Sequence, residues 1–151
     1  MPAFQFRLNR VLEWYRTQFQ LEENRLALCL AALSKVQESI ARLQVEILRI
    51  EREVISGSAI SARDLSALGL YRLRAKVEAA ELEQERARLD RTSKEQMAIV
   101  QAAQRRLRLV EKLRERRLAE HLYAEDQALE SLAAEAYLSK WIAAKSARNV
   151  S

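Results

Sequence analysis

Few side chains in this chain are of the kinds that catalyse reactions or bind metals. The 151 residues include one histidine, His121, and one cysteine, Cys29. A single histidine excludes a cluster of histidine ligands within one chain, and a single cysteine excludes an internal disulfide or a cysteine-based zinc site. Gly57 and Gly69 stand alone, so no glycine-rich loop is available to hold a phosphate. We therefore predict no catalytic site, no metal or cofactor, and no small-molecule substrate.

Charged residues near the C-terminal end have a pattern that points to binding. The segment 105–117 holds seven cations and two carboxylates, the segment 120–135 holds five acidic residues without a Lys or Arg, and three cations follow. At about 100° per residue on a helix, one cationic stripe contains Arg105, Arg108, Lys112 and Arg116. This banding favours electrostatic docking against a complementary protein. A plain solvated helix surface is the alternative.

A nucleic-acid partner is a third interpretation of the basic stripe, because rows of arginine neutralise phosphates. No aromatic residues interleave with the stripe to stack on bases. The neighbouring acidic band would also repel a phosphate backbone. The sequence therefore disfavours nucleic acid as the partner.

The elements that position these residues must be long helices. Ala, Leu, Arg, Glu and Lys make up 60% of the chain, whereas Gly and Pro together number 3. Such a composition is typical of coiled coils, and it lacks the regular turn signals of sandwiches, barrels and α/β folds. Long solvated helices also offer the carboxylates no pocket for acid–base catalysis. No apolar stretch is long enough to span a membrane, and the single cysteine fits a reducing compartment.

An apolar seam runs along the first half of the chain. From Leu8 to Val54 the seam positions alternate in steps of 4 and 3, and 13 of these 14 positions are apolar. Such a heptad seam requires a partner helix in a left-handed supercoil. A weaker seam, with 10 of 14 positions apolar, runs from Leu65 to Val110 and provides the partner. Its members are Leu65, Leu68, Arg72, Ala75, Ala79, Leu82, Arg86, Leu89, Ser93, Gln96, Val100, Ala103, Leu107 and Val110.

The sequence between the seams predicts a tight reversal. Ser and Gly cluster between Val54 and Ser61, and Ser61-Ala-Arg-Asp64 has the pattern of a capping box that opens a helix. We predict an all-α fold, a long two-helix antiparallel coiled-coil hairpin with a C-terminal helix overhang. It forms a single coiled-coil domain over 1–151, with a first helix over about 4–55, a turn over 56–61 and a second helix over about 62–146.

The register of the hairpin follows from a turn centred near Ser58. Leu8 then lies near Arg108, and Glu22, the one polar seam position of the first helix, faces Lys94. Residues after Val110 overhang their partner, and about 35 helical residues span roughly 50 Å. An unpaired apolar stripe on such an overhang marks an interface, a bend back onto the chain, or self-association.

Aromatic residues at the two chain ends are further candidates for binding. Phe4 and Phe6 are either hydrophobic staples at a helix start or anchors into a groove of a partner. The first helical turns could also lie on a membrane surface, with Trp14 at the interface, although the apolar seam competes for the same face. Trp141 lies beyond the expected cover of the hairpin, which favours a partner contact.

Two segments of the chain resemble the FliJ family, the coiled-coil components of the bacterial flagellar type III export apparatus. The first is the N-terminal string Phe4-Gln-Phe-Arg-Leu-Asn-Arg-Val-Leu12, which is similar to the aromatic-x-aromatic-Arg-Leu-x-x-Val-Leu start of those proteins. The second is the basic segment Val110-Glu-Lys-Leu-Arg-Glu-Arg-Arg117, which is followed in the chain by an acidic segment, as in those proteins. Length and the position of the single break also agree, so the resemblance covers nearly the whole chain.

The resemblance implies a non-enzymatic component that looks like the central stalk of a rotary ATPase. Family members bind the hexameric export ATPase, promote its assembly and activity, and couple it to the membrane export gate and to substrate chaperones. By position, the implied ATPase-binding residues are Phe4, Phe6, Arg7, Leu8, Arg10, Arg105, Arg108, Lys112, Arg116 and Trp141. The implied gate-binding stripe is Leu73, Val77, Ala80 and Gln84. In this stripe Leu73 replaces an aromatic residue and Gln84 replaces a more basic one or a histidine.

The implied partners fix an expected location. The ATPase hexamer, the cytoplasmic domain of the export gate and the export chaperones together place the chain in the cytoplasm, peripherally at the cytoplasmic face of the inner membrane. The stalk proteins of injectisomes share this architecture, and the sequence does not separate the two systems. A generic coiled-coil scaffold that dimerises through its overhang is the remaining alternative.

Overall fold

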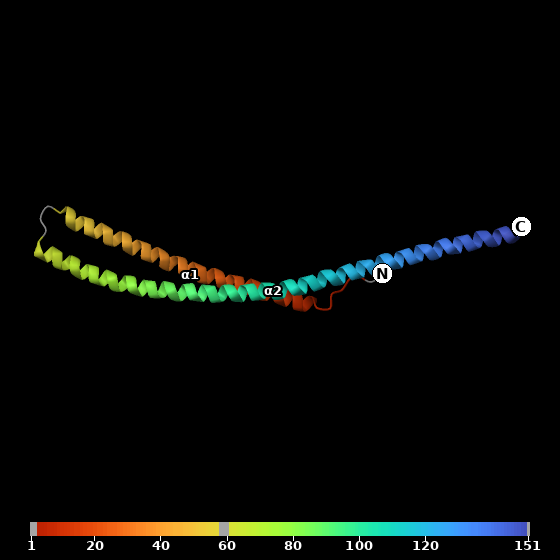
Figure 1. Ribbon diagram of the computed structural model, residues 1–151, viewed down its shortest axis with the longest axis horizontal. Helices are drawn as coiled ribbons and strands as arrows, with labels where there is room; N and C mark the ends of the chain where they lie inside the picture. Colours follow the sequence, from red (N-terminus) through yellow and green to blue (C-terminus); the bar gives the residue numbers. More distant parts are fainter. Residues whose placement is uncertain (1–2, 58–60, 151) are drawn as a thin grey trace. The chain divides into compact units, whose positions relative to one another are not determined.

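The computed structural model describes residues 3–57 and 61–150, which form two long helices. Helix α1 spans Asn9–Ser56 and helix α2 spans Ala62–Val150, and no strand occurs within the described ranges. The helices pack against each other in opposite directions (Figure 1), which confirms the predicted all-α hairpin. The predicted turn centre at Ser58 lies outside the described residues.

The chain divides into two compact units, which we describe separately. Unit 1 comprises Met1–Arg16 and Arg105–Ser151, and unit 2 comprises Thr17–Gln104. Each unit therefore combines a piece of the N-terminal half with a piece of α2. The single domain expected from the sequence stays a prediction.

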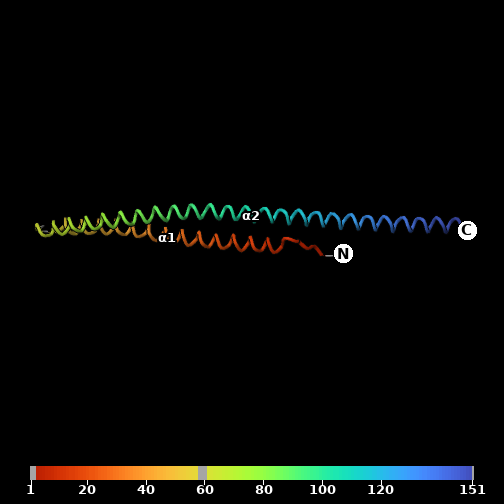
Figure 2. The backbone as a smooth tube through the Cα atoms, turned by 90° about the horizontal axis from the view of Figure 1, so that it is seen from below, coloured from red at the N-terminus to blue at the C-terminus, as the bar shows by residue number. Residues whose placement is uncertain are grey.

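Unit 2 is held together by the seam that the sequence predicts, and its two helices lie side by side in both views (Figures 1 and 2). Its buried side chains are Leu43, Leu68, Ala75, Leu89, Ser93, Val100 and Ala103. All seven are members of the two predicted seams. Burial of apolar surface along this line is what keeps two long helices together in water. At the side of the seam, Arg72 Nε donates a hydrogen bond to Glu51 Oε1 at 3.0 Å.

The polar seam residue Glu22 binds a different partner from the expected one. Gln96 Nε2 donates to the backbone oxygen of Glu22 at 3.1 Å and also to its carboxylate. The predicted Glu22–Lys94 pair is wrong, because Lys94 forms an ion pair with Asp90 on its own helix, at 3.0 Å. Residues two apart on a helix are separated by about 200° around its axis, so Lys94 and Gln96 point to nearly opposite sides of α2. A shift of two residues in register therefore replaces Lys94 by Gln96, itself a predicted seam member.

The start of α2 forms as the sequence predicts. Asp64 N donates to Ser61 Oγ at 3.1 Å, and Ser61 N donates to Asp64 Oδ2 at 3.3 Å. These two bonds are the reciprocal pair of a capping box, which satisfies amide groups that the first helical turn leaves without partners. Helix α2 then continues through Gly69 without interruption. Its length absorbs the helix-propensity cost of that glycine, about 1 kcal/mol.

Both helices differ from the expected bounds at their outer ends. Helix α1 begins at Asn9 rather than near Phe4, because the preceding residues form a turn in which Asn9 N donates to Phe6 O at 3.1 Å. The first five residues of the predicted helix, 4–8, are therefore not helical. Helix α2 extends to Val150, four residues beyond the expected end at 146.

Ser93 provides a test of the seam. Its hydroxyl oxygen is buried, with 6% of the residue exposed, and has no hydrogen-bond partner among the described residues. A buried hydroxyl without a partner costs about 1–3 kcal/mol, so Ser93→Ala is expected to raise the free energy of unfolding by about 1 kcal/mol. Chemical unfolding followed by circular dichroism measures the change. A destabilisation instead would show that Ser93 does not lie in the apolar seam.

Candidate protein-binding surfaces

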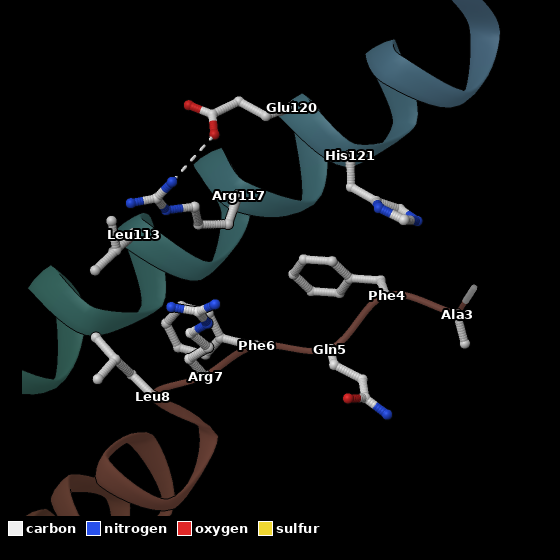
Figure 3. A pocket seen from close by; sticks show the side chains of 10 residues that line it. All are labelled: Ala3, Phe4, Gln5, Phe6, Arg7, Leu8, Leu113, Arg117, Glu120 and His121. Atoms are coloured by element: carbon white, nitrogen blue, oxygen red, sulfur yellow. Dashed lines mark ion pairs between the residues drawn. The ribbon is translucent and has the colours of Figure 1, made fainter. Parts of the chain in front are cut away.

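The N-terminal segment of unit 1 packs across α2 (Figure 3). The ring centroids of Phe4 and His121 lie 5.5 Å apart, and the guanidinium carbon of Arg114 lies 5.9 Å from the Phe4 ring centroid. The ring therefore lies close to both a histidine and a cation, which are groups that interact favourably with aromatic rings. The shallow pocket at this crossing is lined by Ala3, Phe4, Gln5, Phe6, Arg7, Leu8, Leu113, Arg117, Glu120 and His121.

The extended shape of this segment changes the predicted register. Leu8 lines a pocket together with Leu113, which is five residues further along α2 than the expected Arg108. Four residues further towards the N-terminus, Phe4 already reaches His121. An extended chain advances about 3.3 Å per residue and a helix 1.5 Å, so the non-helical residues before the Phe6–Asn9 turn reach further along α2 than helical residues would. The sequence prediction assumed a helix here and therefore placed the segment opposite residues that are too close to the N-terminus of α2.

The packing also changes the interpretation of the two phenylalanines. Phe4 lies five residues before the first residue of α1 and contacts α2, which is not the position of a hydrophobic staple. Both Phe4 and Phe6 are half-buried. Within unit 1 they attach the N-terminal string to the basic segment of α2. The two segments that carry the sequence resemblance thus form one surface.

This combined surface is strongly cationic. Residues 3–16 and 105–117 hold ten cations and three carboxylates, a net charge of +7. Two of the cations form ion pairs, Arg16 with Glu111 at 3.9 Å and Arg117 with Glu120 at 3.6 Å. Arg105, which belongs to the predicted cationic stripe, also interacts with another group of the protein. Among the described residues, no ion pair engages six further cations: Arg7, Arg10, Arg106, Arg108, Lys112 and Arg116. These six charges are available to an acidic partner.

Beyond His121, α2 is uncovered by the described N-terminal residues of unit 1. Every residue from Asp126 to Val150 is exposed. The overhang begins after His121 rather than after Val110, which makes it about 29 residues or roughly 40 Å long. Its large apolar side chains are more than half exposed: Leu122, Tyr123, Leu129, Leu132, Tyr137, Leu138, Trp141 and Ile142. The cation of Lys145 lies 5.0 Å from the centroid of the Trp141 ring.

A second candidate surface lies on unit 2. Leu73 and Val77 are 62% and 55% exposed, and Ala80 and Gln84 are also exposed on α2. Helical spacing places all four on one stripe, on the side of α2 away from the seam. Leu70, at 64% exposure, extends this stripe by one turn. The sequence analysis did not include Leu70, although its spacing of three from Leu73 was a usable signal.

Charges around Gln84 are paired along the helix. Arg86 forms hydrogen-bonded ion pairs with Glu83, and Arg88 does so with Glu85. The hydrogen bond from each arginine lowers the pKa of its glutamate below the usual value. The apolar stripe therefore ends in a region of compensated charge, in contrast to the six cations of unit 1 that form no ion pair with another described residue.

Three further findings bear on what kind of site is present. Neither helix has, within residues 3–57 and 61–150, a stretch long and apolar enough to cross a membrane. The same residues contain no group of three or more His, Cys, Asp or Glu side chains placed to hold a metal ion. No family model, curated protein or solved structure matches the chain. The arrangement of surfaces is therefore the basis for the functional argument.

Removal of the Phe4 ring tests the attachment of the N-terminal segment. Phe4→Ala is expected to expose the bond after Arg7 to trypsin and to increase the cleavage rate at this bond about fivefold, because an aromatic contact contributes about 1 kcal/mol. Timed digestion with mass spectrometry measures the rate. Gln5→Ala is the matched control, since Gln5 is exposed, and it should leave the rate unchanged. Equal rates in the native chain and Phe4→Ala would contradict the attachment.

Proposed function

We propose that the chain is a non-enzymatic stalk of a bacterial type III protein export apparatus, and that it binds the export ATPase through the cationic surface of unit 1. The observation that carries the proposal is the contact of the N-terminal string with the basic segment of α2, at Phe4, Arg114 and His121. These two segments carry the resemblance to the FliJ family. Their union in one surface supports a shared role.

The charges of this surface suit a partner with an acidic face. Six cations of unit 1 have no ion pair with another described residue. Complementary charge accelerates encounter and fixes register more than it adds affinity. An ATPase ring with acidic residues around its central opening would therefore capture and orient unit 1.

Long helices suit the transmission of movement. Helix α2 is continuous over 89 residues, and its capping box at Ser61 and Asp64 fixes the start of the helix. A continuous hydrogen-bonded helix resists bending, so a displacement imposed at one point of α2 is passed to neighbouring turns of that helix. The exposed overhang, including Trp141, offers further apolar surface for insertion into a ring.

The stripe on unit 2 is the proposed contact with the export gate. Leu73, Val77, Ala80 and Gln84 share an exposed face of α2, and Leu70 enlarges its apolar part. An apolar stripe left open beside a covered seam is typical of a docking surface for another helix or groove. Chaperone binding and a peripheral location at the cytoplasmic face of the inner membrane belong to the same proposal. An injectisome in place of a flagellum would use the same surfaces.

The rate of ATP hydrolysis by the purified export ATPase of the same organism tests this proposal. The native chain is expected to raise the rate. The triple reversal Arg108→Glu, Lys112→Glu and Arg116→Glu should weaken its half-maximal effect at least tenfold, because three attractive contacts become repulsive.

A matched control separates a specific site from total charge. The triple reversal Arg42→Glu, Arg52→Glu and Arg91→Glu changes the net charge by the same amount at exposed positions of unit 2. This variant should stimulate the ATPase like the native chain. A hydrolysis rate that ignores the native chain would refute the proposal, and equal losses in both triple variants would refute the assigned surface.

A further inference from the structure

A second stripe on the overhang differs from the faces used above. The positions of this stripe lie within about 80° of one another around α2. They are Leu122, Glu125, Leu129, Ala136, Lys140 and Ala143. Trp141 and the cationic stripe lie on another side of the helix. Leu122 and Leu129 are 51% and 55% exposed, and every stripe residue beyond Glu125 is exposed.

The stripe is complementary to the same stripe of a second copy that runs in the opposite direction. If a second copy lies antiparallel with its Ala136 opposite Leu129, helical spacing also places its Ala143 opposite Leu122 and its Lys140 opposite Glu125. Each large residue then faces a small one, which lets two helices approach closely and interdigitate. The single acidic residue of the stripe faces the single basic one. Two-fold symmetry forms every pair twice.

The wider charge pattern selects the antiparallel arrangement. Residues 120–135 contain five acidic side chains and no Lys or Arg, whereas residues 136–150 contain three Lys or Arg side chains and no acidic ones. In an antiparallel pair with this register, Glu120 and Glu125 of one copy lie at the levels of Lys145 and Lys140 of the other. In a parallel pair in register, like charges would face each other and repel.

We propose that the overhang binds a second copy of this chain as an antiparallel helix pair centred between Leu132 and Ala133. The paired segment, from Leu122 to Ala143, is about 33 Å long. On its own helix, Glu125 lies next to His121, whose Nε2 is 3.1 Å from Glu125 Oε1. Self-association and ATPase binding use different faces of α2, and the self-association proposal does not depend on the ATPase.

Charge reversal at the Glu125–Lys140 pair tests this proposal with the purified full chain. Light scattering over a range of concentrations should show the native mass rising from one chain to two. Glu125→Lys alone and Lys140→Glu alone should each weaken the association at least tenfold, because like charges then face each other. The double variant Glu125→Lys, Lys140→Glu should restore it. An equimolar mixture of the two single variants should also restore it, as heterodimers.

Controls and contrary outcomes are defined by the same variants. Glu135→Lys makes the same charge change on another side of the overhang and should leave the association unchanged. Circular dichroism of each variant checks that helix content is retained. A native chain that stays a monomer at hundreds of micromolar would overturn the proposal, as would a dimer that neither single reversal weakens. ATPase stimulation is measured separately, so failure of one proposal is distinguishable from failure of the other.

Discussion

Apolar contact along a line of alternating three- and four-residue steps is the interaction on which the structure depends. Neither helix has any other means of removing its apolar residues from water, because the chain contains no strand within the described residues and no disulfide is available to it. In unit 2 the seven buried residues all lie on this line. Everything else, including the candidate binding surfaces, consists of side chains that this line leaves facing outwards.

The surfaces differ in how their charges are compensated. In unit 2, arginines and glutamates pair along the same helix, as at Arg86 with Glu83 and Arg88 with Glu85. In unit 1, most cations near the Phe4 contact remain without an ion pair to another described residue. Surface ion pairs contribute little to stability, so this difference bears on binding more than on folding. A surface of uncompensated cations beside an exposed apolar helix suits two distinct protein contacts.

Periodicity and capping made much of the fold predictable. The 3/4 spacing identified every buried residue of unit 2, and the Ser61–Asp64 pattern identified the start of α2. Register was less predictable, because Gln96 and Lys94 are two residues apart and only the facing helix decides between them. The sequence did not predict that the N-terminal segment is non-helical, because Phe4 contacts Arg114 and His121, which lie on a distant part of the chain. No local pattern encodes such a contact.

A disulfide between α1 and α2 tests the seam and its register most directly. In a Cys29→Ser background, Glu22→Cys with Gln96→Cys should form an intrachain disulfide rapidly on mild oxidation, because these side chains meet across the seam. Glu22→Cys with Lys94→Cys should not, since Lys94 points away from the seam. Gel mobility and mass spectrometry of the oxidised chains distinguish the outcomes. Equal cross-linking of both pairs, or cross-links only between chains, would contradict the intrachain seam.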